Sequence, residues 1–137
     1  MKQGIYIFTL LIFFLSCNTD DNYIKNVYVN IEVNLNLPEY SNLTAIGNSI
    51  FIEGGVKGMI IYHFSNSEYR IYDRNCSYEP SLECSRIDSI NGSMALCGCC
   101  ESAFLLDQDG VAANSPAILG LKQYNYSLQN NLLYIFN

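Results

Sequence analysis

The sequence predicts an all-β protein, a small antiparallel β-sandwich or barrel with a cysteine-rich loop at its tip. Residues 27–37 alternate strictly between apolar and polar side chains, as a strand does when one of its faces meets water. Further short apolar stretches recur between turns that are rich in Gly, Asn and Pro, and no stretch after residue 26 has a sustained helical period.

The first half of the domain predicts four strands. Pro38 ends the alternating strand, and residues 42–48 indicate a loop with a short apolar element. Residues 49–53 predict a second strand, which Gly54 and Gly55 close. Residues 57–64 and 68–73 flank a small polar turn, so we expect them to form a hairpin.

The second half predicts further strands around the cysteine-rich loop. Residues 85–90 and 93–96 are joined by Asn91-Gly92, a strong hairpin signal. A short strand at 103–106, a turn at 107–110 and a loop around Ser115-Pro116-Ala117 follow the cysteines. Two last strands are expected near 121–127 and 132–136.

Residues 1–16 predict a signal peptide. Lys2 precedes an apolar run at 5–15, which is too short to cross a bilayer as a permanent helix. The run ends at Phe14-Leu15-Ser16-Cys17, which resembles a bacterial lipobox, in which the cysteine is acylated and becomes the new N-terminus. We therefore expect lipid anchoring through Cys17, with more than one acyl chain to make the anchor stable.

Residues 17–26 then read as the lipidated cysteine and an acidic tether, and residues 27–137 as the domain. Asp20 and Asp21 resemble the surface-export signal of Bacteroidetes lipoproteins. The expected location is the outer membrane, on its periplasmic face or at the cell surface. The expected partners are the lipid bilayer and an unidentified envelope protein.

The amino-acid composition excludes some classes of function. The chain has 7 basic and 13 acidic residues, with a formal net charge of −6, so nucleic acid is excluded as a partner because a phosphate backbone requires clustered Lys and Arg. No catalytic constellation is present in the sequence, and we do not expect an enzyme. Export places the cysteines in an oxidising compartment, where unprotected pairs form disulfides.

Five cysteines fall in the domain, in two groups. The first group reads Cys76-Ser77-Tyr78, with Cys84 shortly after it, and the second reads Cys97-Gly98-Cys99-Cys100-Glu101-Ser102-Ala103-Phe104. Gly110, Ser115-Pro116-Ala117, Leu121 and Tyr124 follow in order. From about residue 26 to the end, this series resembles the Rieske iron-sulfur domain, in which Cys-x-His and Cys-x-x-His loops hold a [2Fe-2S] cluster at the tip of a small β-sandwich.

The resemblance implies a site with altered ligands. Cys76 and Cys97 stand at the two cysteine positions, whereas Tyr78 and Cys100 stand where the family has its histidines. His63 lies in an apolar strand well before the first loop. Without neutral imidazoles, any cluster here is expected to have a low potential. The leader also lacks the arginines of the export route that carries folded, cluster-loaded proteins.

The resemblance further implies a disulfide between the loops, as in Rieske domains of the respiratory type, with Cys99 and Cys84 as its partners. The roles of Cys76, Cys97 and Cys100 stay open. They can form a second cross-link, hold a metal together with a fourth ligand, or act as a redox pair.

Taken together, these features favour a cofactor-free, disulfide-stabilised binding or structural module at the cell envelope. The alternative is a [2Fe-2S] cluster or Zn²⁺ held by Cys76, Tyr78, Cys97 and Cys100, with an electron-transfer role.

Overall fold

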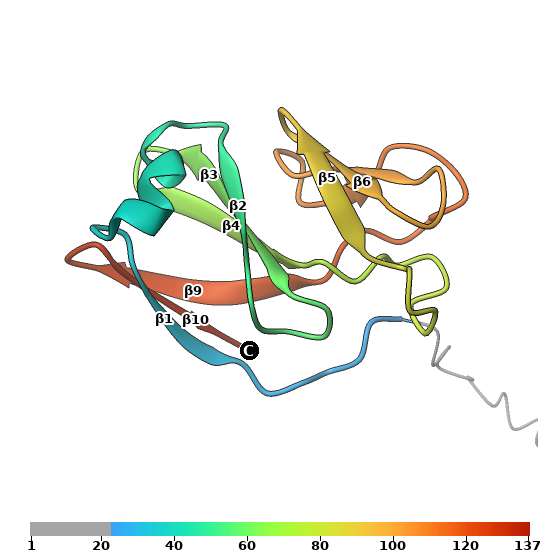
Figure 1. The fold of residues 1–137 in the computed structure, drawn as a ribbon, viewed down its shortest axis with the longest axis horizontal. Coiled ribbons are helices and arrows are strands. Elements are labelled where there is room, and N and C mark those ends of the chain that lie inside the picture. Colours follow the sequence, from blue (N-terminus) through green and yellow to red (C-terminus); the bar gives the residue numbers. More distant parts are fainter. Residues whose placement is uncertain (1–22) are drawn as a thin grey trace, which may run out of the picture.

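The structure is a computed structural model that describes residues 23–137. The predicted signal peptide, Cys17 and residues 18–22 of the predicted tether lie outside these residues. The described chain forms two antiparallel sheets (Figure 1). The larger sheet has the order β1-β10-β9-β4-β3-β2, with strands β1 (Asn30–Asn34), β10 (Leu132–Phe136), β9 (Gln123–Gln129), β4 (Glu68–Asp73), β3 (Met59–Ser65) and β2 (Ser49–Ile52).

The smaller sheet is inserted between β4 and β9. Its order is β5-β6-β7-β8, with strands β5 (Ile87–Asn91), β6 (Met94–Cys97), β7 (Ala103–Leu105) and β8 (Val111–Ala112). Figure 1 shows this sheet in yellow and orange beside the larger one. Four of the five cysteines of the domain lie in the connections before β5 and after β6, and the fifth, Cys97, is the last residue of β6.

Strand β3 lies between two hydrophobic clusters. Met59 and Ile61 pack in the cluster that the larger sheet encloses, while Ile60 and Tyr62 pack toward the smaller sheet. All four side chains are buried, because both faces of β3 are covered. Burial of both faces explains why the sequence of this strand is continuously apolar.

The predicted fold class is confirmed, and the predicted hairpins are present. Strand β3 pairs with β4, β5 with β6, and β9 with β10, all antiparallel. The turn between β5 and β6 differs by one residue from the prediction, because Asn91 pairs with Met94 and the turn is made by Gly92 and Ser93. Gly92 supplies the positive φ of +61° that this turn requires.

Three details of the prediction were wrong. The strand expected at residues 27–37 forms β1 only over Asn30–Asn34, because the chain turns after Asn34, where the Leu37 N–H donates to Asn34 O at 3.1 Å. Pro38 begins a 3-10 helix, η1 (Pro38–Thr44), in a region expected to be largely loop. The two-residue strand β8 was not expected.

Among residues 23–137, no helix is long and apolar enough to cross a membrane.

Candidate metal centre

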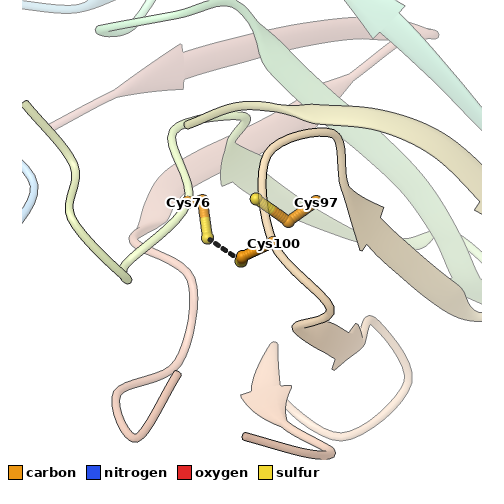
Figure 2. Close-up of side chains that lie close together, drawn as sticks. All are labelled: Cys76, Cys97 and Cys100. Atoms are coloured by element: carbon orange, nitrogen blue, oxygen red, sulfur yellow. Dashed lines mark hydrogen bonds between the residues drawn. The ribbon is translucent and has the colours of Figure 1, made fainter. Parts of the chain in front are cut away.

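Three free cysteine side chains meet where two loops come together (Figure 2). Cys76 lies in the loop after β4, Cys97 ends β6, and Cys100 follows in the loop to β7. Their Sγ atoms all lie within 4.8 Å of one another, and those of Cys76 and Cys100 are 3.9 Å apart. Cys76 and Cys97 are buried, so the half-buried Cys100 is the most exposed of the three.

The first loop is positioned by backbone pairing with the chain just before β5. The Cys76 N–H donates to Ser85 O at 3.1 Å, and the Ile87 N–H donates to Arg74 O at 2.6 Å. Ser85 Oγ donates to Tyr78 O at 2.6 Å, which closes the loop across its base. These bonds fix the backbone of Cys76 even though the loop contains no regular strand.

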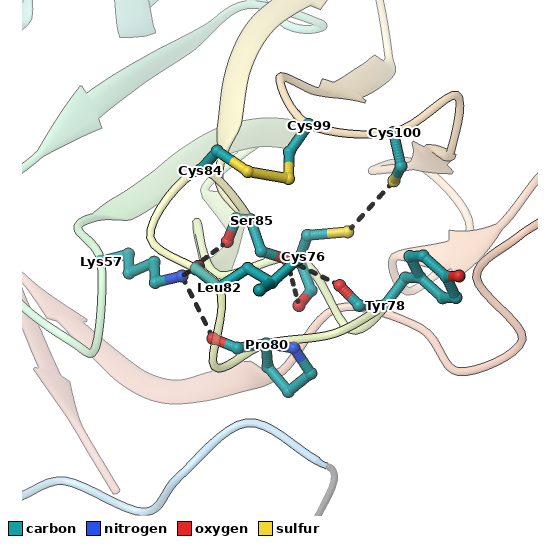
Figure 3. The surroundings of a disulfide bond; sticks show 9 residues. All are labelled: Lys57, Cys76, Tyr78, Pro80, Leu82, Cys84, Ser85, Cys99 and Cys100. Carbon is teal, nitrogen blue, oxygen red and sulfur yellow. Dashed lines mark hydrogen bonds between the residues drawn. A yellow bond between two sulfur atoms is a disulfide. The ribbon is translucent and has the colours of Figure 1, made fainter.

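Lys57 holds the outer part of the same loop. Its Nζ donates to Pro80 O and Ser85 O, each at 3.1 Å, and also to Leu82 O (Figure 3). The ammonium group of Lys57 therefore binds three backbone carbonyl groups of the segment between Cys76 and β5. Burial lowers the pKa of Lys57, and its interactions with Asp73, Cys76 and Cys97 act in the opposite direction.

A disulfide joins the two loops. Cys84 and Cys99, the pair that the Rieske resemblance assigned to a cross-link, are bonded with an S–S distance of 2.06 Å (Figure 3). The bond lies beside the three free cysteines, since Cys99 is the immediate neighbour of Cys100. It keeps Cys76 on one loop facing Cys97 and Cys100 on the other.

The second loop is fixed on both sides. The Gly98 N–H donates to Arg86 O at 2.9 Å, and the Cys97 N–H donates to Ser102 O at 3.1 Å. The buried Ser102 Oγ accepts a hydrogen bond from the Ala117 N–H at 2.9 Å. The 115–117 segment expected from the sequence therefore contacts the end of the cysteine loop.

The thiols differ in acidity. Burial raises the pKa of Cys76 to about 12, and its hydrogen bond with Cys97 acts in the same direction. Burial also acts to raise the pKa of Cys100, but hydrogen bonds from the side chain and backbone of Ser102, and from Cys97 and Cys76, outweigh burial and lower it. Cys100 is thus the thiol of this pair that ionises more readily.

The spacing of the sulfurs matches the edges of one tetrahedron. Zinc–thiolate bonds are about 2.3 Å long, so two thiolates on one tetrahedral zinc lie about 3.8 Å apart. The 3.9 Å between Cys76 Sγ and Cys100 Sγ agrees with that edge, and the third sulfur is also close enough to share the ion. The arrangement can supply three ligands to a single ion and leaves a fourth position for another donor.

A two-iron cluster of the Rieske type does not fit the same donors. Such a cluster divides four protein ligands between two irons, so ligands on different irons lie farther apart than ligands on one ion. Here the three sulfurs form one compact group. The phenol of Tyr78, the remaining residue of the expected ligand set, points away from Cys76 and Cys100 (Figure 3) and is 37% exposed.

His63 does not join the group. It lies on β3 in the larger sheet, buried and stacked on Tyr69 with 4.7 Å between ring centroids. Within residues 23–137, the three cysteines are the His, Cys, Asp or Glu side chains placed closely enough to hold a metal.

Sequence reasoning missed the residues that support the site. Lys57 was interpreted only as the start of a strand, and Asp73 as the end of a strand and the approach to the first cysteine loop, without a role in supporting it. Asp73 is fully buried and accepts a hydrogen bond from the Asn75 N–H at 2.7 Å, directly before Cys76. The available signal was the position of Asp73 at the junction between a hydrophobic strand and the first cysteine loop.

No protein-family model matches the chain, and no curated protein matches it. Solved structures do. A chain of the complex of reduced oxygenase and oxidized ferredoxin in carbazole 1,9a-dioxygenase is similar over 82% of this chain and 94% of its own length, with 12% identity and a TM-score of 0.51. The ferredoxin of carbazole 1,9a-dioxygenase from Nocardioides aromaticivorans IC177 is similar over 81% and 98%, with 11% identity and a TM-score of 0.48.

At 12% identity, the likeness to the first of these structures bears on the fold alone. Its similarity covers 82% of this chain, which has an antiparallel, nearly all-β architecture. The chain has a Rieske-like fold.

Proposed function

We propose that this protein is an exported lipoprotein, acylated at Cys17, whose Rieske-like domain binds a single soft or borderline metal ion such as Zn²⁺ through Cys76, Cys97 and Cys100. The observation that carries the proposal is the compact group of three free sulfurs, all within 4.8 Å of one another. Thiolate ligands suit Zn²⁺, and the fourth position accepts water or a ligand from outside the chain.

The electrostatics support an ion at this position. Three thiolates and a divalent cation carry a combined charge of −1, whereas three unneutralised thiolates would repel one another. Lys57 interacts electrostatically with Cys76 and Cys97 and can balance the remaining charge. Burial of Cys76 disfavours its free thiolate, so ionisation of this thiol is expected to be coupled to metal binding.

Metal content and free thiols test the proposal on one sample. The full-length lipoprotein would be extracted from membranes in detergent, analysed for metals and then titrated for thiols after denaturation. We expect one zinc ion per chain and three free thiols. Cys97→Ser and Cys100→Ser should lose the ion. The double variant Cys84→Ser/Cys99→Ser is the matched control, because it removes two cysteines and none of the three proposed ligands.

The second candidate function is the cofactor-free, disulfide-stabilised module that the sequence favoured. The 3.9 Å between Cys76 Sγ and Cys100 Sγ supports it, since a modest approach of the loops would allow a second disulfide. This candidate predicts no bound metal and a single free thiol. Two irons with inorganic sulfide and visible absorption would instead contradict both candidates and establish a [2Fe-2S] protein.

A further inference from the structure

Exposed apolar side chains gather beside the first cysteine loop. Tyr23, Tyr78, Pro116, Ile118 and Leu119, here called the tip patch, line one surface hollow of about 490 Å³. Ile118 is 93% exposed and Leu119 is 53% exposed, which is unusual for large aliphatic side chains next to one another. Ser77 Oγ donates a hydrogen bond to Leu119 O, so the patch is attached directly to the residue that follows Cys76.

The described chain begins at this patch. Tyr23 lines the hollow, and its hydroxyl donates to Gly120 O at 3.3 Å. Figure 1 shows the blue start of the described chain beside the yellow-green loop between β4 and β5. The connection toward the N-terminus therefore leaves the domain at the cysteine-bearing end and not at the far end, where η1 lies.

The length of chain before Tyr23 limits where an anchored domain can be. Six residue steps separate Cys17 from Tyr23, and even fully extended they span only about 20 Å. If Cys17 carries acyl chains in a bilayer, Tyr23 cannot lie farther than this from the membrane surface, and the rest of the tip patch lines the same hollow as Tyr23. The opposite end of the domain has no such restraint.

From this placement we infer that the tip patch rests on the surface of the lipid bilayer that holds the anchor, so the three-cysteine site faces the membrane. The inference rests on the proposed acylation of Cys17. Aliphatic side chains and tyrosines are the residues that enter the boundary between headgroups and acyl chains.

The charge of the protein defines which bilayer suits the patch. The chain carries a net charge of −6, and Glu79 lies at the edge of the hollow. The tip patch itself is apolar and carries no cluster of basic residues, so the contact does not depend on anionic lipid and suits a zwitterionic bilayer. We expect it to persist when the ionic strength is raised.

The absence of tryptophan from the sequence makes a direct experiment possible. A single tryptophan introduced as Ile118→Trp would report on the patch, and Leu37→Trp would serve as the control. Leu37 is also a large exposed aliphatic residue, 45% exposed, and it precedes η1 at the other end of the domain. Each full-length lipidated variant would be reconstituted in phosphatidylcholine vesicles with and without brominated acyl chains.

We expect the tryptophan at 118 to shift its emission to the blue and to be quenched by the brominated lipid, at low and at high salt. The tryptophan at 37 should do neither. Flotation of both variants with the vesicles, and its loss in Cys17→Ser, tests the anchor separately.

If the protein floats but brominated lipid quenches the tryptophan at 118 no more than the tryptophan at 37, the inference is overturned and the anchor stands. The tip patch would then not contact lipid. Failure of the wild type to float would overturn the anchor and the inference together. Neither result bears on metal binding.

Discussion

Asp73 is the residue that links the larger sheet to the first cysteine loop. Its carboxylate is fully buried and accepts hydrogen bonds from the N–H groups of Val56, Lys57 and Asn75 and from the Tyr124 hydroxyl. Hydrogen bonds to a charged acceptor are stronger than neutral ones, and four donors compensate its removal from water. The bond to Asn75 carries this fixed geometry directly to Cys76.

The surroundings of Asp73 leave no room for a side chain at Gly55. This glycine has a φ of +62°, and a Cβ atom there would lie 2.5 Å from Asp73 Oδ2 and 2.9 Å from the Tyr124 hydroxyl oxygen. The loop between β2 and β3 can therefore approach the carboxylate only with glycine at this position.

Buried tyrosines should make the protein unstable at alkaline pH. Burial raises the pKa of Tyr72 to about 12, and its hydroxyl donates to Leu106 O at 2.8 Å. The folded chain keeps this proton above pH 10, where the unfolded chain releases it, so stability is fully present below a pH of about 10 and falls as the pH rises toward 12. Two pKa units correspond to about 3 kcal/mol.

Urea unfolding across this alkaline range measures the effect. Tyr72→Phe should be less stable than the wild type at neutral pH, because it loses the bond to Leu106, but its stability should fall less steeply with pH. An identical slope in both proteins would show that another group controls alkaline unfolding.

At the scale of secondary structure, alternation and turn residues predicted most of the strands correctly. The hairpins β3–β4 and β9–β10 are built from contiguous sequence, so their signals are local. The C-terminal end of β1 was not predicted, because a local turn follows Asn34, in which the Leu37 N–H donates to Asn34 O and the Asn36 N–H donates to Asn34 Oδ1. The apolar and polar residues continue to alternate through this turn, so the alternation alone does not mark the end of the strand.

The candidate site was also predicted only in part. The order of the cysteine loops was enough to suggest that Cys76, Cys97 and Cys100 meet. The direction of the Tyr78 phenol could not be predicted in this way, since the side chain lines a hollow together with Ile118 and Leu119, which are forty or more residues away in the sequence. Lys57 was also missed, because its three carbonyl partners lie 23 to 28 residues away in a loop without regular structure.

The disulfide between the loops should contribute measurably to stability. The bond closes a loop with a sequence separation of 15, for which the chain-entropy model gives about 3 kcal/mol. Cys84→Ser/Cys99→Ser should therefore unfold at lower urea concentration with the same denaturant dependence. It should still bind one metal ion, but more weakly, because the two ligand-bearing loops are no longer fastened together.

The double variant is compared with Cys100→Ser. That substitution removes a half-buried thiol and leaves the disulfide in place, so we expect it to change the urea midpoint of the metal-free protein much less. Equal losses in the two variants would indicate that the disulfide adds no stability beyond side-chain packing.

For the molecule as a whole, the larger sheet acts as a support and the smaller sheet presents the site. The two hydrophobic clusters meet at β3 and β4, and Cys76 and Cys97 both belong to the cluster between the sheets. Substituting these cysteines, or removing a metal ion bound to them, therefore alters the edge of a hydrophobic core and should affect the stability of the domain.

Metal removal should consequently destabilise the folded protein. An ion that binds only the folded chain adds about 4 kcal/mol at a free concentration a thousand times its dissociation constant. We expect a chelator to lower the melting temperature of the wild type, and added Zn²⁺ to restore it. Cys100→Ser should melt at the same temperature with chelator and with zinc, whereas Cys84→Ser/Cys99→Ser should still respond. A wild-type melting temperature that neither treatment alters would contradict metal binding at the three sulfurs, and it would leave the second disulfide, between Cys76 and Cys100, as the explanation for their proximity.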